Sequence, residues 1–236
     1  MAYRRPHFSS FVLKLPPDKA QYAFIRQQDE KYCVLRFNKH TFVWIWSVEI
    51  LNSLNVQFNH AQYSDEILAA SVCALLDNNI ILAMATVQVG DSYINSAHFA
   101  YNERLELIIF THPYAEHSQN LLLNTSVAVA VWNTPPVWGL YLQGLQMFGH
   151  AAPVPTESLP QAITVYRQRF PAFGNVIHAA EDFKRNITTM RLYAIQVERI
   201  KLIDELRFGK RNWITAAITN PPSGSLLPER LSQFYN

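Results

Sequence analysis

The segment that decides the fold runs from Ile80 to His150 and has the sequence IILAMATVQVGDSYINSAHFAYNERLELIIFTHPYAEHSQNLLLNTSVAVAVWNTPPVWGLYLQGLQMFGH. It opens with a strand over Ile80–Val89, which begins with four consecutive apolar residues. We expect that start to be buried on both faces of a sheet. A tight turn at Gly90 and Asp91 leads into a second strand over Tyr93–Tyr101, and the two strands form a hairpin.

Alternating and helical patterns continue on both sides of this hairpin. Period-two alternation predicts further strands at Leu105–Thr111, Val127–Val131, Trp138–His150 and Leu192–Leu202. Apolar spacings of three and four predict helices that start at Ser64 or Asp65 and end near Leu76, and that cover Ala115–Leu123 and Leu159–Phe170. Gly144 and Gly149 permit a barrel strand to bend, and the alternation of the last strand slips once, at Gln196. This order predicts a mainly β fold with flanking helices, in which antiparallel strands close into a barrel and so remove exposed edges.

Composition narrows the classes of function. The 236 residues are 49% hydrophobic and 16% charged, which favours a packed globule over disorder. A net charge of +2 gives no reason to expect nucleic acid as a partner, and the basic residues of the first sixty positions are most simply a solvated surface. No apolar run approaches the ~20 residues of a membrane helix, and no signal peptide is evident. Cys33 and Cys73 are typical of thiols in a reducing compartment, so we expect a cytoplasmic protein with no membrane partner.

Several short motifs follow one another in a family-specific order. They are Leu82–Val87, the pair Phe110 and Thr111, Asn120–Asn124, Val127–Val131 and Gly139–Gly144. This order resembles the pyridoxamine 5′-phosphate oxidase-like FMN-binding split-barrel family. The stretches YRQRFP (Tyr166–Pro171) and IKLIDELRFGKRNWI (Ile200–Ile214) are similar to the end of its small uncharacterised bacterial members. The resemblance implies a split-barrel domain over residues 62–215, an amino-terminal extension over 1–61 and a carboxyl-terminal tail over 216–236.

The resemblance also implies a cofactor, an assembly and a set of site residues. FMN would lie in a groove between the two barrels of a homodimer. Asn95, Ser96 and Ala97 would run beside the isoalloxazine ring, and Phe110 and Thr111 would lie at the ring and the ribityl chain. His117 and Ser118, at a helix start whose free N–H groups attract anions, would lie near the phosphate. The residues that would close the pocket, from the partner subunit or the carboxyl end, are Trp138, Gln143, Lys210 and Trp213.

One departure from the family pattern leaves two functions open. The oxidases place Ser-Arg-Lys where this chain has Ala115, Glu116 and His117, so the cations that would pair with the phosphate are missing and pyridoxamine phosphate oxidase activity itself is not expected. Lys210 and Arg211 are the residues that would compensate. One hypothesis is an FMN-dependent oxidoreductase that acts on an unknown small substrate. The other is a non-enzymatic protein that has lost the phosphate site and binds haem or another ligand.

Catalytic and metal-binding residues are not evident in the sequence. A flavin carries its own redox chemistry, so no catalytic side chain is assigned. The histidines lie on separate predicted elements without ligand spacing, so no metal site is expected.

Overall fold

The structure is a computed structural model that describes residues 56–88, 90–134, 137–218 and 225–227, with the backbone of four short strands nearer the amino terminus. Those strands are β1 (Ala23–Arg26), β2 (Tyr32–Leu35), β3 (Phe37–Asn38) and β4 (Thr41–Phe42). β1 pairs with β2 and β3 pairs with β4, both antiparallel. They belong to a compact unit of residues 1–46, distinct from a second unit of residues 47–236. The side chain of Cys33 lies outside the described residues.

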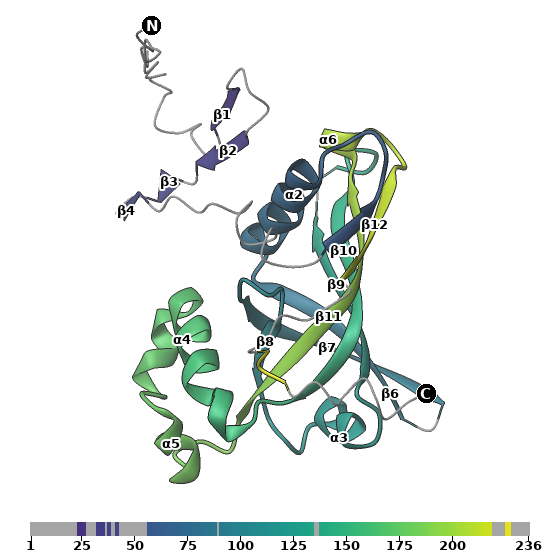
Figure 1. Ribbon diagram of the computed structural model, residues 1–236. Coiled ribbons are helices and arrows are strands. Elements are labelled where there is room, and N and C mark those ends of the chain that lie inside the picture. The colour runs from purple at the N-terminus through teal and green to yellow at the C-terminus, as the bar shows by residue number, and fades with distance from the viewer. Residues whose placement is uncertain are drawn as a thin grey trace, which may run out of the picture. The chain divides into compact units, whose positions relative to one another are not determined.

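The second unit is built on an eight-stranded sheet whose order is β10-β9-β6-β7-β8-β11-β12-β5. β10 also pairs with β11, which closes the sheet into a barrel (Figure 1). All of its strand pairings are antiparallel. The strands are β5 (Val56–Asn59), β6 (Ile81–Gln88), β7 (Asp91–Tyr101), β8 (Leu107–Thr111), β9 (Ser126–Asn133), β10 (Gln143–Pro153), β11 (Arg191–Asp204) and β12 (Trp213–Ile218).

The long strand β11 divides the barrel. Its first residues, Arg191–Ile195, pair with β8, whereas Arg199–Ile203 pair with β12 along the same edge. Its other edge pairs with β10 from Gln143 to Pro153. The two parts of β11 therefore pair with different strands along one edge, as in a split barrel. The predicted mainly β split barrel with flanking helices is confirmed.

Helices cover the ends and one side of this barrel (Figure 1). Helix α2 (Asp65–Asn78) begins after Ser64 as predicted, and its buried residues pack on the same core as the inward side chains of β6, β9 and β10. Helix α3 (Glu116–Leu123) lies against β6, where Asn120 Nδ2 donates to Thr86 Oγ1 at 3.1 Å. The remaining helices are α4 (Leu159–Arg169), α5 (Ala180–Lys184), α6 (Glu205–Phe208) and the 3-10 turns η1 (Thr156–Ser158) and η2 (Pro171–Asn175).

A second core lies outside β8, between that strand and α4, and it includes a segment close to the carboxyl end. Leu226 and Leu227 are buried in it and belong to the same cluster as Ile163 of α4. The buried carboxylate of Glu106 accepts the Leu226 backbone N–H at 2.8 Å and the Ser225 hydroxyl. Its other oxygen accepts Asn102 Nδ2 at 2.6 Å, so three donors hold one buried charge.

The sheet extends beyond both expected domain boundaries. β5 lies before residue 62 and pairs with β12, because an edge strand leaves backbone groups for another strand to satisfy. β12 continues past residue 215 to Ile218, and residues 225–227 join the second core. Two segments of the expected tail over 216–236 are therefore part of the folded unit.

Two local expectations from the sequence are wrong. Ile80 and Ile81 are half exposed rather than buried on both faces, and β6 begins only at Ile81. The strand predicted from Trp138 begins only at Gln143. Gly139 has a φ of 86° and the Leu142 backbone N–H donates to Glu205 Oε2 at 2.9 Å, so the preceding residues turn instead of extending.

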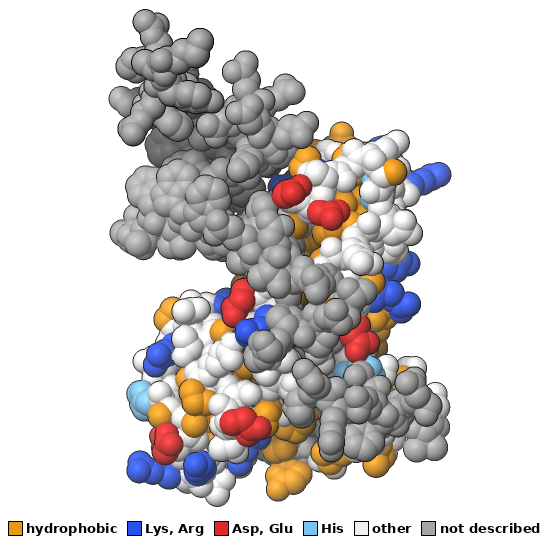
Figure 2. Space-filling model, viewed as in Figure 1, with side chains coloured by type: hydrophobic (Ala, Val, Ile, Leu, Met, Phe, Trp, Pro, Cys, Tyr) orange, Lys and Arg blue, Asp and Glu red, His pale blue; other side chains and the backbone are white. Residues whose placement is uncertain are grey.

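The surface over α4 and α5 carries basic and acidic side chains close together (Figure 2). Among the helices that the structure describes, none has the length and apolar character required to cross a membrane.

Candidate functional site

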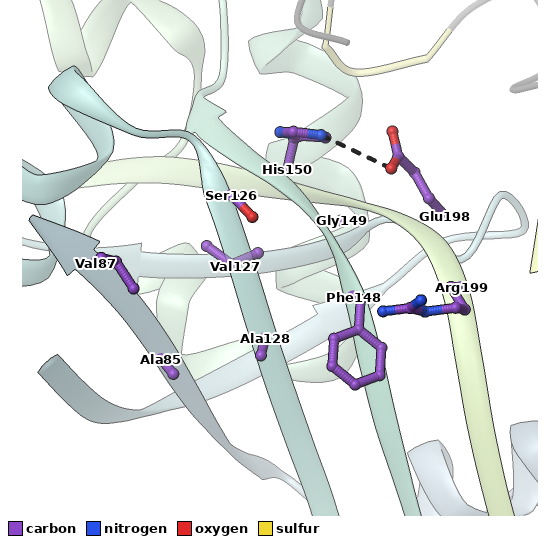
Figure 3. Close-up of a pocket in the computed structure, with 10 residues that line it drawn as sticks. All are labelled: Ala85, Val87, Ser126, Val127, Ala128, Phe148, Gly149, His150, Glu198 and Arg199. Atoms are coloured by element: carbon purple, nitrogen blue, oxygen red, sulfur yellow. Dashed lines mark ion pairs between the residues drawn. The ribbon is translucent and has the colours of Figure 1, made fainter. Parts of the chain in front are cut away.

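A groove with charged walls lies on the outer face of the barrel and has a volume of about 450 Å³. Strands β6, β9, β10 and β11 run side by side beneath it (Figure 3). Ten residues line it: Ala85, Val87, Ser126, Val127, Ala128, Phe148, Gly149, His150, Glu198 and Arg199.

The floor of the groove is flat because the strands alternate large inward side chains with small outward ones. Val127 and Val129 of β9 are buried in the barrel, whereas Ala128 between them faces outward. Ala128 is paired with Ala85 of β6, so two methyl groups form the centre of the floor. A planar ring can approach the sheet closely at this pair, since each of the two side chains is only a methyl group, whereas Val87 and Phe148 also line the groove.

A β-bulge creates the charged wall. Phe148 pairs with Arg199 and Gly149 pairs with Val197, so β11 has one extra residue, Glu198, at this point. The extra residue places two consecutive charged side chains, Glu198 and Arg199, at the groove. A Cβ atom on Gly149 would lie 1.9 Å from the backbone oxygen of Gln196, so the bulge requires glycine there.

The charged residues at the groove are held by specific contacts. His150 Nδ1 and Thr125 Oγ1 are 2.9 Å apart and share a hydrogen bond whose direction follows the imidazole tautomer. On the other side of the ring, Nε2 lies 3.7 Å from Glu198 Oε2, where a protonated imidazole forms an ion pair (Figure 3). The Arg199 guanidinium lies over the ring of Phe148, 4.4 Å from its centroid.

These features together fit a planar ligand that has an anionic end. The volume lies within the range of about 300–1,000 Å³ typical of small-molecule sites. The methyl floor and Phe148 provide apolar surface for a ring system, and Arg199 provides a planar donor group for phosphate or carboxylate.

A second groove of about 430 Å³ continues along the same outer face. Ala83 and Ala130, the next outward pair on β6 and β9, belong to it, and Trp132 also lines it. Of the site residues expected from the sequence, Ser96 lies in this second groove.

The two expected phosphate-site residues, His117 and Ser118, lie together with Thr111, expected at the ring and ribityl chain, but inside the protein. Thr111 Oγ1 and His117 Nε2 are 2.8 Å apart, and both side chains and that of Ser118 are buried. Burial lowers the pKa of His117, so the ring is held neutral. Glu116 is exposed in the first turn of α3. A neutral histidine and a carboxylate do not fit a phosphate dianion at this helix start.

Three more of the expected residues contribute to packing within the barrel wall and the second core. Asn95 is paired with the buried Met84, so its side chain faces the barrel interior, and Ala97 packs against the main core. Phe110 packs in the second core, where its ring meets that of Phe173 edge to face at 5.1 Å.

The remaining expected residues lie toward the α6 end of the molecule. Gln143 Nε2 donates to the buried Asp204 Oδ1 at 2.7 Å, so this amide is part of a structural network. The Trp213 ring lies 6.1 Å from that of Trp132, and Lys210 is exposed. Trp138 is completely exposed.

Sequence reasoning therefore missed the residues that make the groove charged, namely His150, Glu198 and Arg199. Their signal in the sequence was the slip of alternation at Gln196, which marks the bulge. Among the described residues, no three His, Cys, Asp or Glu side chains gather to hold a metal ion.

Comparison with known proteins shows the fold but not a family. No protein-family model matches the chain, and a search of curated proteins also found no match. A haem-binding protein from Mycobacterium smegmatis is similar at a TM-score of 0.50 and 14% identity, over 67% of this chain and 60% of its own. This chain therefore spans less than two thirds of that protein.

Two further solved structures have lower TM-scores. A haem storage protein from Vibrio cholerae has a TM-score of 0.46 and 19% identity, over 57% of this chain and 93% of its own. A FAD-binding protein from Mesorhizobium loti has a TM-score of 0.44 and 14% identity, over 70% of this chain and 98% of its own.

Proposed function

We propose that this protein binds FMN in the outer groove over Ala85 and Ala128 and acts as a flavin-dependent oxidoreductase on a small substrate, other than pyridoxamine phosphate oxidase itself. The observation that supports this is a flat apolar floor beside a guanidinium group, which matches a planar ring system with a phosphate. The motif order of the split-barrel flavoproteins, given above, is the reason to choose a flavin among such ligands.

The residues of the chain would position the ligands, and the flavin would supply the hydride transfer when bound. Ala85 and Ala128 allow the ring to lie close to the sheet, and Phe148 borders it. His150 is held by Thr125 and lies at the edge of the groove, where it can donate or accept a proton. The groove is shallow, so a second molecule is needed to exclude water from the reacting atoms.

A homodimer would supply that cover. Outward residues of β6 and β7 that flank the grooves are apolar and exposed, and the most exposed of them, Ile94, has 68% of its surface accessible. Ile81 and Val87 lie on the same outer face, and such patches in soluble proteins commonly mark interfaces. We propose that a second copy packs on this face and that the pocket lies at the subunit interface.

Substitution of Ile94 by Glu tests the homodimer. A buried unpaired carboxylate is costly, so Ile94→Glu should yield monomers in light scattering and lose bound flavin. Leu122→Glu is the matched control, because Leu122 has a similar exposure but lies on α3. A wild-type protein that is monomeric at micromolar concentration would refute the proposal of a shared pocket.

A non-enzymatic haem-binding function is the second candidate, and two observations favour it. Glu116 and the neutral His117 leave the family's phosphate site without a cation. His150, at the groove, provides an imidazole of the kind that haem iron takes as a ligand.

An absorbance spectrum of the purified protein distinguishes the two candidates. The protein is measured as purified, and again after incubation with excess FMN or haem and desalting. Retained flavin bands at about one FMN per chain would support the oxidoreductase proposal. A retained haem band without flavin would select the second candidate. A protein that retains neither would contradict both.

A further inference from the structure

The charge distribution around the outer groove carries an inference about how its ligand is recognised. The helix start where the family resemblance would place the phosphate offers a buried histidine and an exposed glutamate, Glu116. By contrast, the groove includes the guanidinium group of Arg199. Among the described residues, this group forms no ion pair with a carboxylate.

The position of Arg199 follows from the bulge. Without the extra residue at Glu198, strict alternation along β11 could not direct both charged side chains to the groove while Val197 and Ile200 remain buried. Phe148, directly opposite Arg199 on β10, supports the guanidinium from below at 4.4 Å. The ring restricts the side chain through its face, and the guanidinium extends from β11 toward Phe148 (Figure 3).

The one carboxylate in the groove is turned toward another partner. Glu198 Oε2 faces His150 Nε2 at 3.7 Å, and Thr125 fixes the opposite side of that ring at 2.9 Å. The Glu198 carboxylate is thus directed toward His150 rather than toward Arg199 (Figure 3). Ser126, which is exposed at the same groove, adds a hydroxyl group.

We propose that Arg199 is the anion-binding residue of the outer groove and binds the phosphate or carboxylate group of its planar ligand. The identification of the ligand as FMN rests on the proposed function. The anion subsite itself rests only on the geometry of the bulge. The phosphate anchor is thus on strand β11 rather than at the start of α3. Guanidinium binds such an anion through two parallel hydrogen bonds, which ammonium cannot reproduce.

Comparison of FMN with riboflavin isolates the contribution of the phosphate, because the two flavins differ only in that group. Dissociation constants are measured by flavin fluorescence quenching for wild type, Arg199→Gln and Arg199→Lys. Wild type should bind FMN at least about tenfold more tightly than riboflavin, as expected for one charge-assisted contact. Arg199→Gln should lose most of that ratio without weakening riboflavin, and Arg199→Lys should recover only part of it.

Lys201 provides the matched control. It lies two residues along β11 from Arg199 and its ammonium is also placed over an aromatic ring, that of Trp213 at 5.0 Å, but it does not line the groove. Lys201→Gln should keep the ratio of FMN to riboflavin affinity. Glu198→Gln should increase FMN affinity severalfold, because it removes the negative charge beside the anion.

The outcomes separate this inference from the proposed function. Suppose that wild type binds both flavins. If Arg199→Gln then leaves the ratio of FMN to riboflavin affinity unchanged, or if Lys201→Gln lowers that ratio equally, Arg199 does not bind the phosphate, although the proposal of flavin binding stands. If wild type binds neither flavin, the proposed function fails, and inorganic phosphate then tests the subsite by NMR of the Arg199 Nε–H. A phosphate-dependent shift of that signal would support the anion subsite, and its absence would overturn it.

Discussion

Substitution of Gly149 by Ala tests the reasoning about the bulge most directly. A Cβ at this position would lie 1.9 Å from the oxygen and 3.0 Å from the carbonyl carbon of Gln196. Both atoms are backbone, so no side-chain rotation relieves the contact. The strands must separate by more than an ångström, which overpacks the site at about 1–3 kcal/mol and weakens at least one ladder hydrogen bond worth about 1 kcal/mol. We expect Gly149→Ala to lower the free energy of unfolding by about 3 kcal/mol.

Urea unfolding followed by circular dichroism measures this loss as a shift of the midpoint. Gly139→Ala is the control, since Gly139 has open space around its Cβ position but a φ of 86°. Only backbone strain of about 1 kcal/mol applies there. The reasoning is refuted if Gly149→Ala unfolds within about 0.5 kcal/mol of wild type, or if the control loses as much stability.

Three further predictions concern residues away from the groove. Glu106→Gln should cost about 1–3 kcal/mol in urea unfolding, because its new NH2 group would face other donors, either Asn102 Nδ2 or the Ser225 hydroxyl and the Leu226 N–H. An unchanged midpoint would contradict this role. Burial lowers the pKa of His117 in the folded protein, so as the pH falls this histidine is protonated in the unfolded chain before it is protonated in the folded one. The free energy of unfolding therefore decreases as the pH drops below the ordinary histidine pKa of about 6.5. His117→Gln should flatten that part of the slope in melts from about pH 7.5 to 5, and parallel slopes would exclude the effect. Arg169 Nη2 donates to the carbonyls of Leu76 and Asn79 at the end of α2, so Arg169→Met should cost about 2 kcal/mol of unfolding free energy, whereas a cost near zero would show that water replaces it.

The elements that the sequence predicted well have long local patterns. The hairpin of β6 and β7 and the helix α2 each carry a period that is repeated over several residues, and both were placed within a few residues of their observed bounds. β12 was missed because Thr215, Ala216 and Ala217 are small and lack contrast between the two faces. The pairing of β5 with β12 depends on a contact between segments far apart in the chain, which no local pattern reports.

The candidate site was harder to predict than the fold. Ala85 and Ala128 carry no functional signal in the sequence, yet their small size is what makes the groove floor flat. Arg199 and His150 meet there only because a bulge shifts one strand against its neighbour. Family resemblance instead indicated Thr111 and His117, which are in contact with each other but buried.

The contact between Glu106 and Leu226 has a consequence for how the chain acquires its structure during synthesis. The two residues are 120 positions apart, so the second core cannot be completed until residues 225–227 have been translated. Contacts of such long sequence separation slow folding, because the loop between them must first be closed. Until then, the apolar surfaces of β8 and α4 stay accessible to other chains. A chain released before residue 225 would therefore be an intermediate prone to aggregation, although it contains all the barrel strands that the structure describes.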